Sequence, residues 1–230
     1  KKQQKEAVDF TVKNWEKSQE DINKSNIKTI LKTHNMLCKI NLEGKDYSFT
    51  NLKNTIGVIH IVRDPRNIVT SAKNHFSLNT AEESIEMISD KFNWTGFKNN
   101  EVPQLLSSWG NHFNSWKKFP KNYLLIKYED LVSDIKKEIL RKKEYLSNHF
   151  EYKISETKVS EIERNISFEN FKDLENKGKF SENSINNISG EKNTFFNLGP
   201  KNDWKKILKK ENNNKIEKIF FNEMKELGYL

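Results

Sequence analysis

Two side chains that could bind phosphate, Arg63 and Ser71, flank one predicted strand-to-helix junction of this chain. Residues 56–63 form a short apolar run rich in β-branched residues, typical of a strand covered on both faces. Asp64 can cap the helix that follows, and Pro65 fits its first turn. Arg63 then stands at the carboxyl end of the strand, and Ser71 comes round to the capped face of the helix. A guanidinium and a hydroxyl in this arrangement can hold one phosphate between them.

Arg63 and Ser71 also have ordinary structural interpretations. Arg63 could form a salt bridge with Asp64 or with another nearby acid. Ser71 could be a small residue where the helix meets the sheet. The spacing alone leaves the functional and the structural interpretations open.

A lysine and a histidine close a second predicted strand, residues 27–33. If this strand is parallel to residues 56–63, His34 and Arg63 emerge at the same edge of the sheet. Histidine titrates near neutral pH, so His34 could take a proton from an acceptor hydroxyl. Lys32 could neutralise charge on an anionic group in transfer. The alternative is a histidine that ends a strand and bonds a backbone carbonyl.

Two further positions could contact a nucleotide. Tyr128 closes a third predicted strand, residues 122–128, where an aromatic ring can pack on a base or can simply fill the end of the sheet. Residues 177–202 form a long loop rich in glycine, serine and asparagine. Within that loop, Gly199 would let the backbone approach a ligand closely, although neighbouring aromatic residues could equally pin the loop to the core.

The elements that must position these groups alternate between strands and helices. Helices are expected at residues 6–25, 65–76, 81–92, 104–119, 133–150, 156–165, 168–176, 203–208 and 215–227, with polar loops at 41–54 and 93–102. This alternation predicts an α/β fold in which a central parallel sheet is flanked by helices. Three strands are few for such a sheet, so others are either unrecognised or lie before residue 1.

Composition limits the chemistry. The formal net charge of +8 favours an anionic partner, although lysine and glutamate alternate along most predicted helices and explain much of it as ordinary surface. The single cysteine, Cys38, excludes an intrachain disulfide and a thiolate metal site, and the five histidines are scattered, so no metal is expected. No apolar run approaches the length of a membrane span, and no secretory signal is present.

Four motifs occur in an order that resembles the sulfotransferase family that uses 3′-phosphoadenosine 5′-phosphosulfate (PAPS). They are Lys-Thr-His at 32–34, Val-Arg-Asp-Pro-Arg-Asn-x-x-x-Ser at 62–71, Tyr-Glu-Asp-Leu at 128–131 and Gly-x-x-x-Asp-Trp-Lys at 199–205. The resemblance runs from about residue 27 to residue 208. It implies a three-layer, P-loop-NTPase-like α/β domain spanning residues 1–230, and sulfuryl transfer from PAPS to an acceptor hydroxyl or amine.

The resemblance also implies roles for individual residues. His34 would be the general base that deprotonates a small-molecule acceptor, and Lys32 would steady the sulfuryl group. Arg63 and Ser71 match the family's contacts to the 3′-phosphate. The other positions on the nucleotide side are Tyr128 and Phe168 near the adenine, and Asn197, Leu198 and Gly199 over the 3′-phosphate. The product would be 3′,5′-adenosine bisphosphate (PAP), and neither a metal nor a nucleic-acid partner is implied.

The sequence departs from the family pattern twice. The phosphosulfate-binding loop, typically Pro-Lys-Ser-Gly-Thr-Thr-Trp after the first strand, does not occur in residues 1–230, so we expect a domain truncated at its N-terminus. Asn197-Leu198 stands where many members have Arg-Lys. Two alternatives therefore stay open, a nucleotide-binding fragment without catalysis and a basic nucleic-acid-binding protein. A cytoplasmic location is expected.

Overall fold

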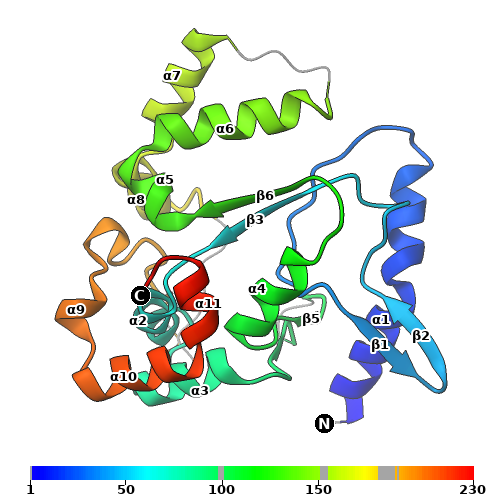
Figure 1. The fold of residues 1–230 in the computed structure, drawn as a ribbon, viewed down its shortest axis with the longest axis horizontal. Helices are drawn as coiled ribbons and strands as arrows, with labels where there is room; N and C mark the ends of the chain where they lie inside the picture. The colour runs from blue at the N-terminus through cyan, green and yellow to red at the C-terminus, as the bar shows by residue number, and fades with distance from the viewer. Residues whose placement is uncertain (1, 98–100, 151–154, 181–189, 191) are drawn as a thin grey trace. The chain divides into compact units, whose positions relative to one another are not determined.

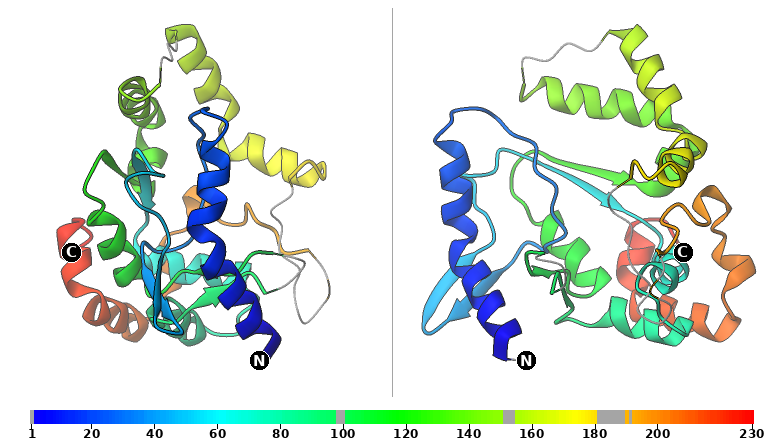
Figure 2. Two further views of the ribbon diagram at one scale, coloured as in Figure 1. Left: turned by 90° about the vertical axis from the view of Figure 1, so that its right-hand side faces the viewer. Right: turned by 180° about the vertical axis from the view of Figure 1, so that it is seen from behind.

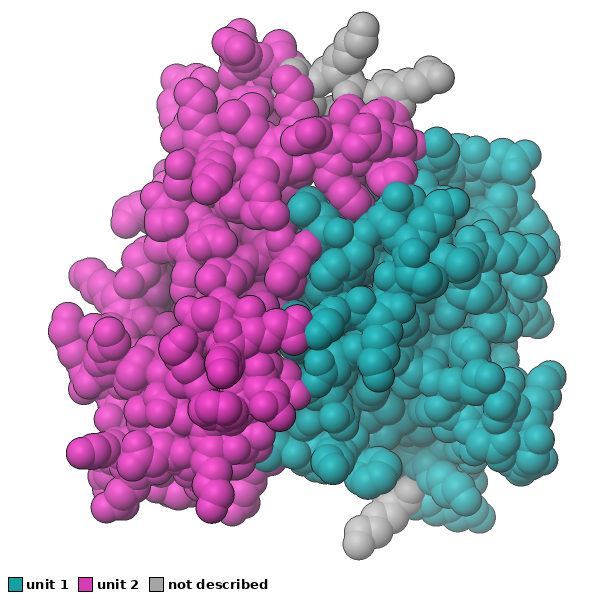
Figure 3. Space-filling model, viewed as in Figure 1, with its two compact units in different colours: residues 1–60, 89–124 teal, residues 61–88, 125–230 magenta. Residues whose placement is uncertain are grey.

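The computed structural model describes residues 2–97, 101–150, 155–180, 190 and 192–230 (Figure 1). The chain divides into two compact units, which are coloured separately in Figure 3. Unit 1 comprises residues 1–60 and 89–124, and unit 2 comprises residues 61–88 and 125–230. Lys32 and His34 belong to unit 1, whereas the predicted nucleotide-side residues all belong to unit 2.

A parallel pair of strands, β3 (Val58–Val62) and β6 (Tyr123–Lys127), forms the sheet that the sequence predicted most clearly. The Val58 N–H donates to the Asn122 carbonyl at 2.8 Å, which aligns the starts of the two strands, and Figure 1 shows both arrows running the same way. Val62 and Ile126 are buried, as expected for strands covered by helices. The predicted α/β class with a parallel sheet is therefore confirmed.

Unit 1 is built from a long helix, two small antiparallel strand pairs and a shorter helix. These are α1 (Lys2–Asn23), β1 (Lys39–Leu42) with β2 (Lys45–Ser48), β4 (Trp94–Thr95) with β5 (Gln104–Leu105), and α4 (Trp109–Lys117). Helix α1 packs against the β1–β2 hairpin (Figure 2). Trp15 of α1 meets Phe49 edge to face, and Phe49 meets Trp116 of α4 in the same way.

Unit 2 contains α2 (Pro65–His75) and most of the other helices of the chain. The remaining elements are α3 (Ala81–Ser89), α5 (Tyr128–Ser133), α6 (Ile135–Ser147), α7 (Glu156–Asn165), α8 (Phe168–Asn176), the 3-10 turn η1 (Gly199–Lys201), α9 (Trp204–Ile207), α10 (Lys210–Ile219) and α11 (Phe221–Glu226). Helices α9 and α10 contact α2 (Figure 1). The apolar core of this unit includes Val69, Ile216 and Met224.

The strand predicted at residues 27–33 is wrong. Residues 26–36 have no regular secondary structure, and the side chains of Ile27, Ile30 and Leu31 are 70%, 68% and 59% exposed. β-Branched residues favour a strand because they pack on a covered, paired surface, and the described residues show no strand pairing for this segment. The apolar alternation alone was therefore insufficient evidence.

The loop predicted at residues 41–54 contains most of the β1–β2 hairpin. Glu43 and Gly44 have φ of +54° and +82°, which is the backbone of a two-residue hairpin turn that matches the twist of the strands. The loop predicted at 93–102 likewise contains β4. Short strands of two to four residues carry too little periodicity to be recognised in a polar sequence.

Three predicted helices differ from the helices observed: one starts later and two are divided. The helix predicted at 104–119 starts only at Trp109, because the Ser108 hydroxyl caps it by accepting from the Asn111 N–H at 3.3 Å. Asp134 separates α5 from α6 within the helix predicted at 133–150. Phe220 separates α10 from α11 near the predicted 215–227 helix. Within the part of the chain that is described, no helix is long and apolar enough to cross a membrane.

Candidate functional site

Arg63, Ser71 and Tyr128 lie together at the carboxyl ends of β3 and β6. The Arg63 Nη1 donates to the Ser71 Oγ at 3.1 Å across the first turns of α2. The Arg63 guanidinium also lies over the Tyr128 ring, 4.2 Å from its centroid, in a cation–π contact. The structure therefore brings these three side chains together, while their role in binding stays a prediction.

Arg63 does not use Asp64 as its counter-ion. The Asp64 carboxylate instead accepts from Arg66, at 2.9 Å from Nε and 2.7 Å from Nη2, and caps α2 through the Arg66 backbone N–H. Among the described residues no carboxylate forms an ion pair with Arg63, and its buried Nε has no hydrogen-bond partner. Burial lowers the pKa of the Arg63 guanidinium, and nearby Tyr128 and Glu129 partly offset this.

Arg63 is therefore a desolvated cation with an unused donor. A group of this kind recovers the most free energy from an anion with several acceptor oxygens, because charge-assisted hydrogen bonds strengthen when water is excluded. The arrangement at the end of β3 is suited to a phosphate or sulfate oxygen.

Asn202 is a residue of this cluster that the sequence analysis missed. Its side-chain Nδ2 donates to the Ser71 Oγ at 2.9 Å and to the Asn67 carbonyl at 3.0 Å, and its Oδ1 accepts from the Thr70 hydroxyl at 2.5 Å. The Asn202 side chain thus fastens residues 199–202 to α2 beside Ser71. The available signal was its place in the Gly-x-x-x-Asp-Trp-Lys motif, three residues after Gly199.

Gly199 approaches the Phe168 ring closely, and the predicted approach of its backbone to a ligand stays a prediction. Its φ is +51°, and a Cβ built on it would overlap the Phe168 ring. Phe168 also meets Phe196, with ring centroids 6.2 Å apart. Through Asn202, the loop bearing Gly199 and the helix bearing Phe168 are linked to the Arg63–Ser71 pair.

The other two predicted positions of the loop, Asn197 and Leu198, make different contacts. Asn197 lines a polar cavity of about 370 Å³ together with Thr70 and Lys73. The Leu198 carbonyl accepts from the Lys201 N–H at 2.9 Å and so belongs to the η1 turn. No contact of either side chain with Arg63 is described.

Charged groups hold the β3–α2 junction in place. Glu129 accepts from the Asp64 N–H at 3.0 Å and from the Tyr229 hydroxyl at 2.9 Å. Arg66 also donates to Glu217 at 2.7 Å and to the Tyr229 carbonyl at 2.8 Å. Burial is the main cause of the raised pKa of Tyr229, so its hydroxyl stays protonated and donates. These bonds fix the backbone from which Arg63 extends.

His34 and Lys32 lie in an exposed, irregular segment of unit 1. The His34 N–H donates to the Gln104 Oε1 at 2.9 Å, which ties the segment to β5. The premise that a parallel strand delivers His34 to the edge of the β3 sheet is wrong, because residues 27–33 are not a strand. The grouping of His34 with Arg63 and Tyr128 stays a prediction.

Buried histidines lie behind this segment. The ring of His112 hydrogen-bonds the backbone of His34 and of Asn35, and burial lowers the pKa of His112 to about 4 despite these contacts. His60 lies 5.4 Å from His112 between ring centroids, shares a 2.8 Å hydrogen bond with the Tyr123 hydroxyl, and has its pKa lowered to about 3 by burial. In the described ranges no group of three histidine, cysteine or acidic residues could hold a metal.

Comparison with known proteins agrees with these motifs. The family model described as "Sulfotransferase domain" matches residues 4–228. Among curated proteins, an amine sulfotransferase of Oryctolagus cuniculus is 28% identical over 75% of this chain and 56% of its own length. Sulfotransferase 2A1 of Macaca fascicularis is 27% identical over 74% of this chain and 57% of its own.

A solved structure shows the same fold. Mouse sulfotransferase SULT7A1, complexed with PAP, superposes with a TM-score of 0.54 at 21% identity, covering 75% of this chain and 59% of that one. The chain thus spans a little over half the length of the relatives it matches. Because the family model covers nearly all of its residues, this chain belongs to the sulfotransferase domain family.

Proposed function

We propose that this protein is a cytoplasmic sulfotransferase that moves a sulfuryl group from PAPS to a hydroxyl or amine of a small-molecule acceptor. The observation that carries the proposal is the Arg63–Ser71 pair at the end of β3, stacked on Tyr128 and joined to the Gly199 loop by Asn202. Membership of the sulfotransferase domain family and the PAP complex of a protein with the same fold support it. The single cysteine, Cys38, is compatible with the proposed compartment.

The nucleotide half of the site fits the donor. The unpaired, buried Nε of Arg63 and the Ser71 hydroxyl would bind oxygens of the 3′-phosphate, and the Asn202 amide would orient the Ser71 hydroxyl. Tyr128 and Phe168 would offer aromatic faces to the adenine. Residues 197–199 would close over the phosphate, with Asn197 and Leu198 contributing no charge.

Chemistry at the acceptor would depend on His34 and Lys32. When bound, PAPS supplies a sulfuryl group already activated by its anhydride bond to phosphate. His34, exposed and therefore able to reach an acceptor, would take the proton from the attacking hydroxyl or amine. Lys32, two residues earlier, would neutralise negative charge on the group in transfer. We propose no metal-dependent step.

The test is calorimetric titration of the protein with PAP. We expect Arg63→Ala to weaken PAP binding by more than about 1.5 kcal/mol, the scale of a charge-assisted hydrogen bond. Adenosine 5′-monophosphate, which lacks the 3′-phosphate, should bind weakly to both proteins and show little difference between them. Arg164→Ala, which removes an exposed guanidinium from α7, is the matched control. Equal PAP affinity in wild type and Arg63→Ala would overturn the phosphate assignment.

Two other outcomes separate the alternative functions. A protein that binds the nucleotide without transfer would bind PAP yet move no label from radiolabelled PAPS. The net charge of +8 favours nucleic-acid binding only if affinity for unrelated duplexes falls steeply with salt. Neither nucleic acid nor a membrane is part of the proposed function.

A further inference from the structure

The proposed base, His34, lies outside any helix or strand. An exposed side chain on irregular backbone keeps a fixed position only if its neighbours hold the backbone, because each ordered residue loses about 1–2 kcal/mol of conformational entropy. The structure shows which neighbours do this. They come from β5 and α4, which are far from His34 in sequence.

Asn35, the next residue, is the most constrained residue of the segment. Its side chain is buried, with the residue 5% exposed, and its Oδ1 accepts from the Leu105 N–H at 2.7 Å. Its backbone carbonyl accepts from the Trp116 indole N–H at 2.8 Å, and its own N–H donates to the Thr33 hydroxyl at 3.0 Å. A buried carboxamide with this many partners defines one backbone conformation, because any other leaves polar groups unpaired.

Gln104 and His112 hold His34 itself. The Gln104 side-chain oxygen accepts from the His34 N–H at 2.9 Å, and the His112 ring hydrogen-bonds the backbone of His34 and Asn35. Gln104 precedes Leu105 in β5, so one short strand contacts both residues. Asn35, Gln104 and His112 therefore surround the backbone at His34, and we refer to these three side chains as the clamp.

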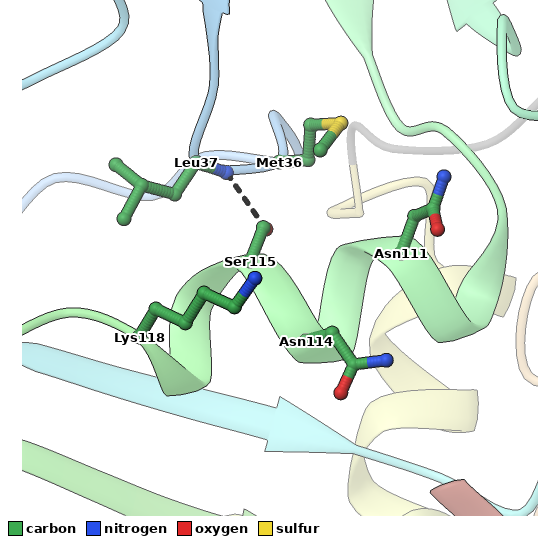
Figure 4. Close-up of a pocket in the computed structure, with 6 residues that line it drawn as sticks. All are labelled: Met36, Leu37, Asn111, Asn114, Ser115 and Lys118. Atoms are coloured by element: carbon green, nitrogen blue, oxygen red, sulfur yellow. Dashed lines mark hydrogen bonds between the residues drawn. The ribbon is translucent and has the colours of Figure 1, made fainter. Parts of the chain in front are cut away.

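The chain beyond His34 is anchored as well. The Met36 N–H donates to the Leu105 carbonyl at 2.8 Å, and the Leu37 N–H donates to the Ser115 hydroxyl of α4 at 3.0 Å (Figure 4). Figure 4 also shows Asn111, on the same helix, lining a cavity of about 340 Å³ with Met36 and Leu37. Asn111 uses its side-chain amide on Ser107, so it lies outside the clamp.

We propose that Asn35, Gln104 and His112 are positioning residues that fix the backbone of His34 and thereby aim its imidazole at the acceptor. None of them needs to touch the substrate or the nucleotide. The inference rests on the proposed function, because it assigns catalytic meaning to His34. It predicts that loosening the clamp slows the transfer step while leaving nucleotide binding in unit 2 intact.

The experiment compares transfer from radiolabelled PAPS to 2-naphthol and to aniline, with His34→Ala defining the background rate. Gln104→Ala removes only the acceptor of the His34 N–H, and we expect kcat to fall about tenfold. Asn35→Ala, which frees more backbone, should lower kcat about a hundredfold. The KM for PAPS should change less than about twofold in both. Gln104→Glu keeps an acceptor oxygen and should recover most of the rate.

Asn111→Ala is the matched control, because it removes a carboxamide near the segment without touching residues 33–35. Amide hydrogen exchange at His34 gives a second readout, and in Gln104→Ala it should accelerate at least about tenfold. This exchange rate tests whether the clamp holds the backbone of His34, even if Asn35→Ala does not fold. Unchanged exchange and unchanged kcat in Gln104→Ala would overturn the positioning role while the proposed function stands. An inactive wild type would instead overturn the proposed function, and with it the catalytic meaning of the clamp.

Discussion

The Arg63 cluster and the His34 segment hold their functional side chains in different ways. Arg63 extends from the end of a strand into a helix whose side chains bond one another, as Asn202 does with Ser71 and Thr70. His34 extends from irregular backbone that neighbouring side chains hold through its peptide groups. The first arrangement fixes the direction of a guanidinium, and the second fixes the backbone that carries an exposed imidazole.

The two regions also differ in charge. The junction below Arg63 is held by a buried ionic network in which Arg66 joins Asp64 and Glu217. Behind His34, the buried groups are neutral carboxamides and imidazoles. The first region should therefore be sensitive to loss of a charge, and the second to protonation of its buried imidazoles.

The largest expected loss in the free energy of unfolding is that caused by Arg66→Ala. Removing Arg66 leaves Asp64 buried without its cation, and breaking a buried pair in this way costs about 3–5 kcal/mol. Urea denaturation followed by circular dichroism measures the free energy of unfolding. Arg164→Ala, at an exposed site, should change it by less than about 0.5 kcal/mol. Equal free energies of unfolding for Arg66→Ala and Arg164→Ala would show that the Arg66–Asp64 pair does not stabilise the junction.

Acid should lower the stability of the protein mainly through two histidines of unit 1. Burial lowers the pKa of His60 to about 3 and that of His112 to about 4, from an ordinary value of 6.5. Between about pH 6.5 and 4 the unfolded chain therefore binds more protons than the folded one, and stability falls as the pH drops. By pH 5 the expected loss is about 2 kcal/mol for each imidazole.

Urea denaturation at pH 7 and pH 5 measures this loss. His60→Gln keeps a polar partner for the Tyr123 hydroxyl but cannot take up a proton, so it should abolish about half of the acid effect. If the variant loses as much stability as the wild type between the two pH values, the buried imidazoles are not responsible.

The smallest expected effect is a difference in stability between alanine substitutions at two glycines of unit 2. Gly178 and Gly199 have φ of +68° and +51°, so alanine at either position is strained by about 1–2 kcal/mol. An added Cβ at Gly178 meets nothing within 4 Å, whereas at Gly199 it overlaps the Phe168 ring. Gly199→Ala should therefore cost at least about 1 kcal/mol more than Gly178→Ala in thermal or urea denaturation. Equal costs would show that the loop can retreat from Phe168 freely.

The strong local signals of the sequence predicted the Arg63 junction well. The capping Asp64, the Pro65 start and the apolar run before them define β3 and α2 within a residue or two. Helices α7 and α8 occupy the residues that were predicted, each after a serine cap. Signals of this kind act within one turn or one strand, so they can be seen without knowing the fold.

The residues that the sequence did not reveal act across long separations. Asn202 contacts Ser71 across 131 positions, and Asn35 contacts Trp116 across 81. Asn202 stands inside the Gly-x-x-x-Asp-Trp-Lys motif and Asn35 directly follows Lys-Thr-His, but nothing in the sequence identifies their distant partners. The error at residues 27–33 has the same origin, since an apolar alternation becomes a strand only beside a partner that the sequence does not identify.

The contacts of Arg66 also set an order for biosynthesis. Its guanidinium reaches Glu217 and the Tyr229 carbonyl, which follow it by 151 and 163 positions. A ribosome therefore releases α2 long before the groups that complete its charge pairing exist. Closing such distant contacts is slow, because chain entropy is lost before the contacts form. Helix α2 therefore cannot complete its charge pairing until residues 217–229 have been synthesised.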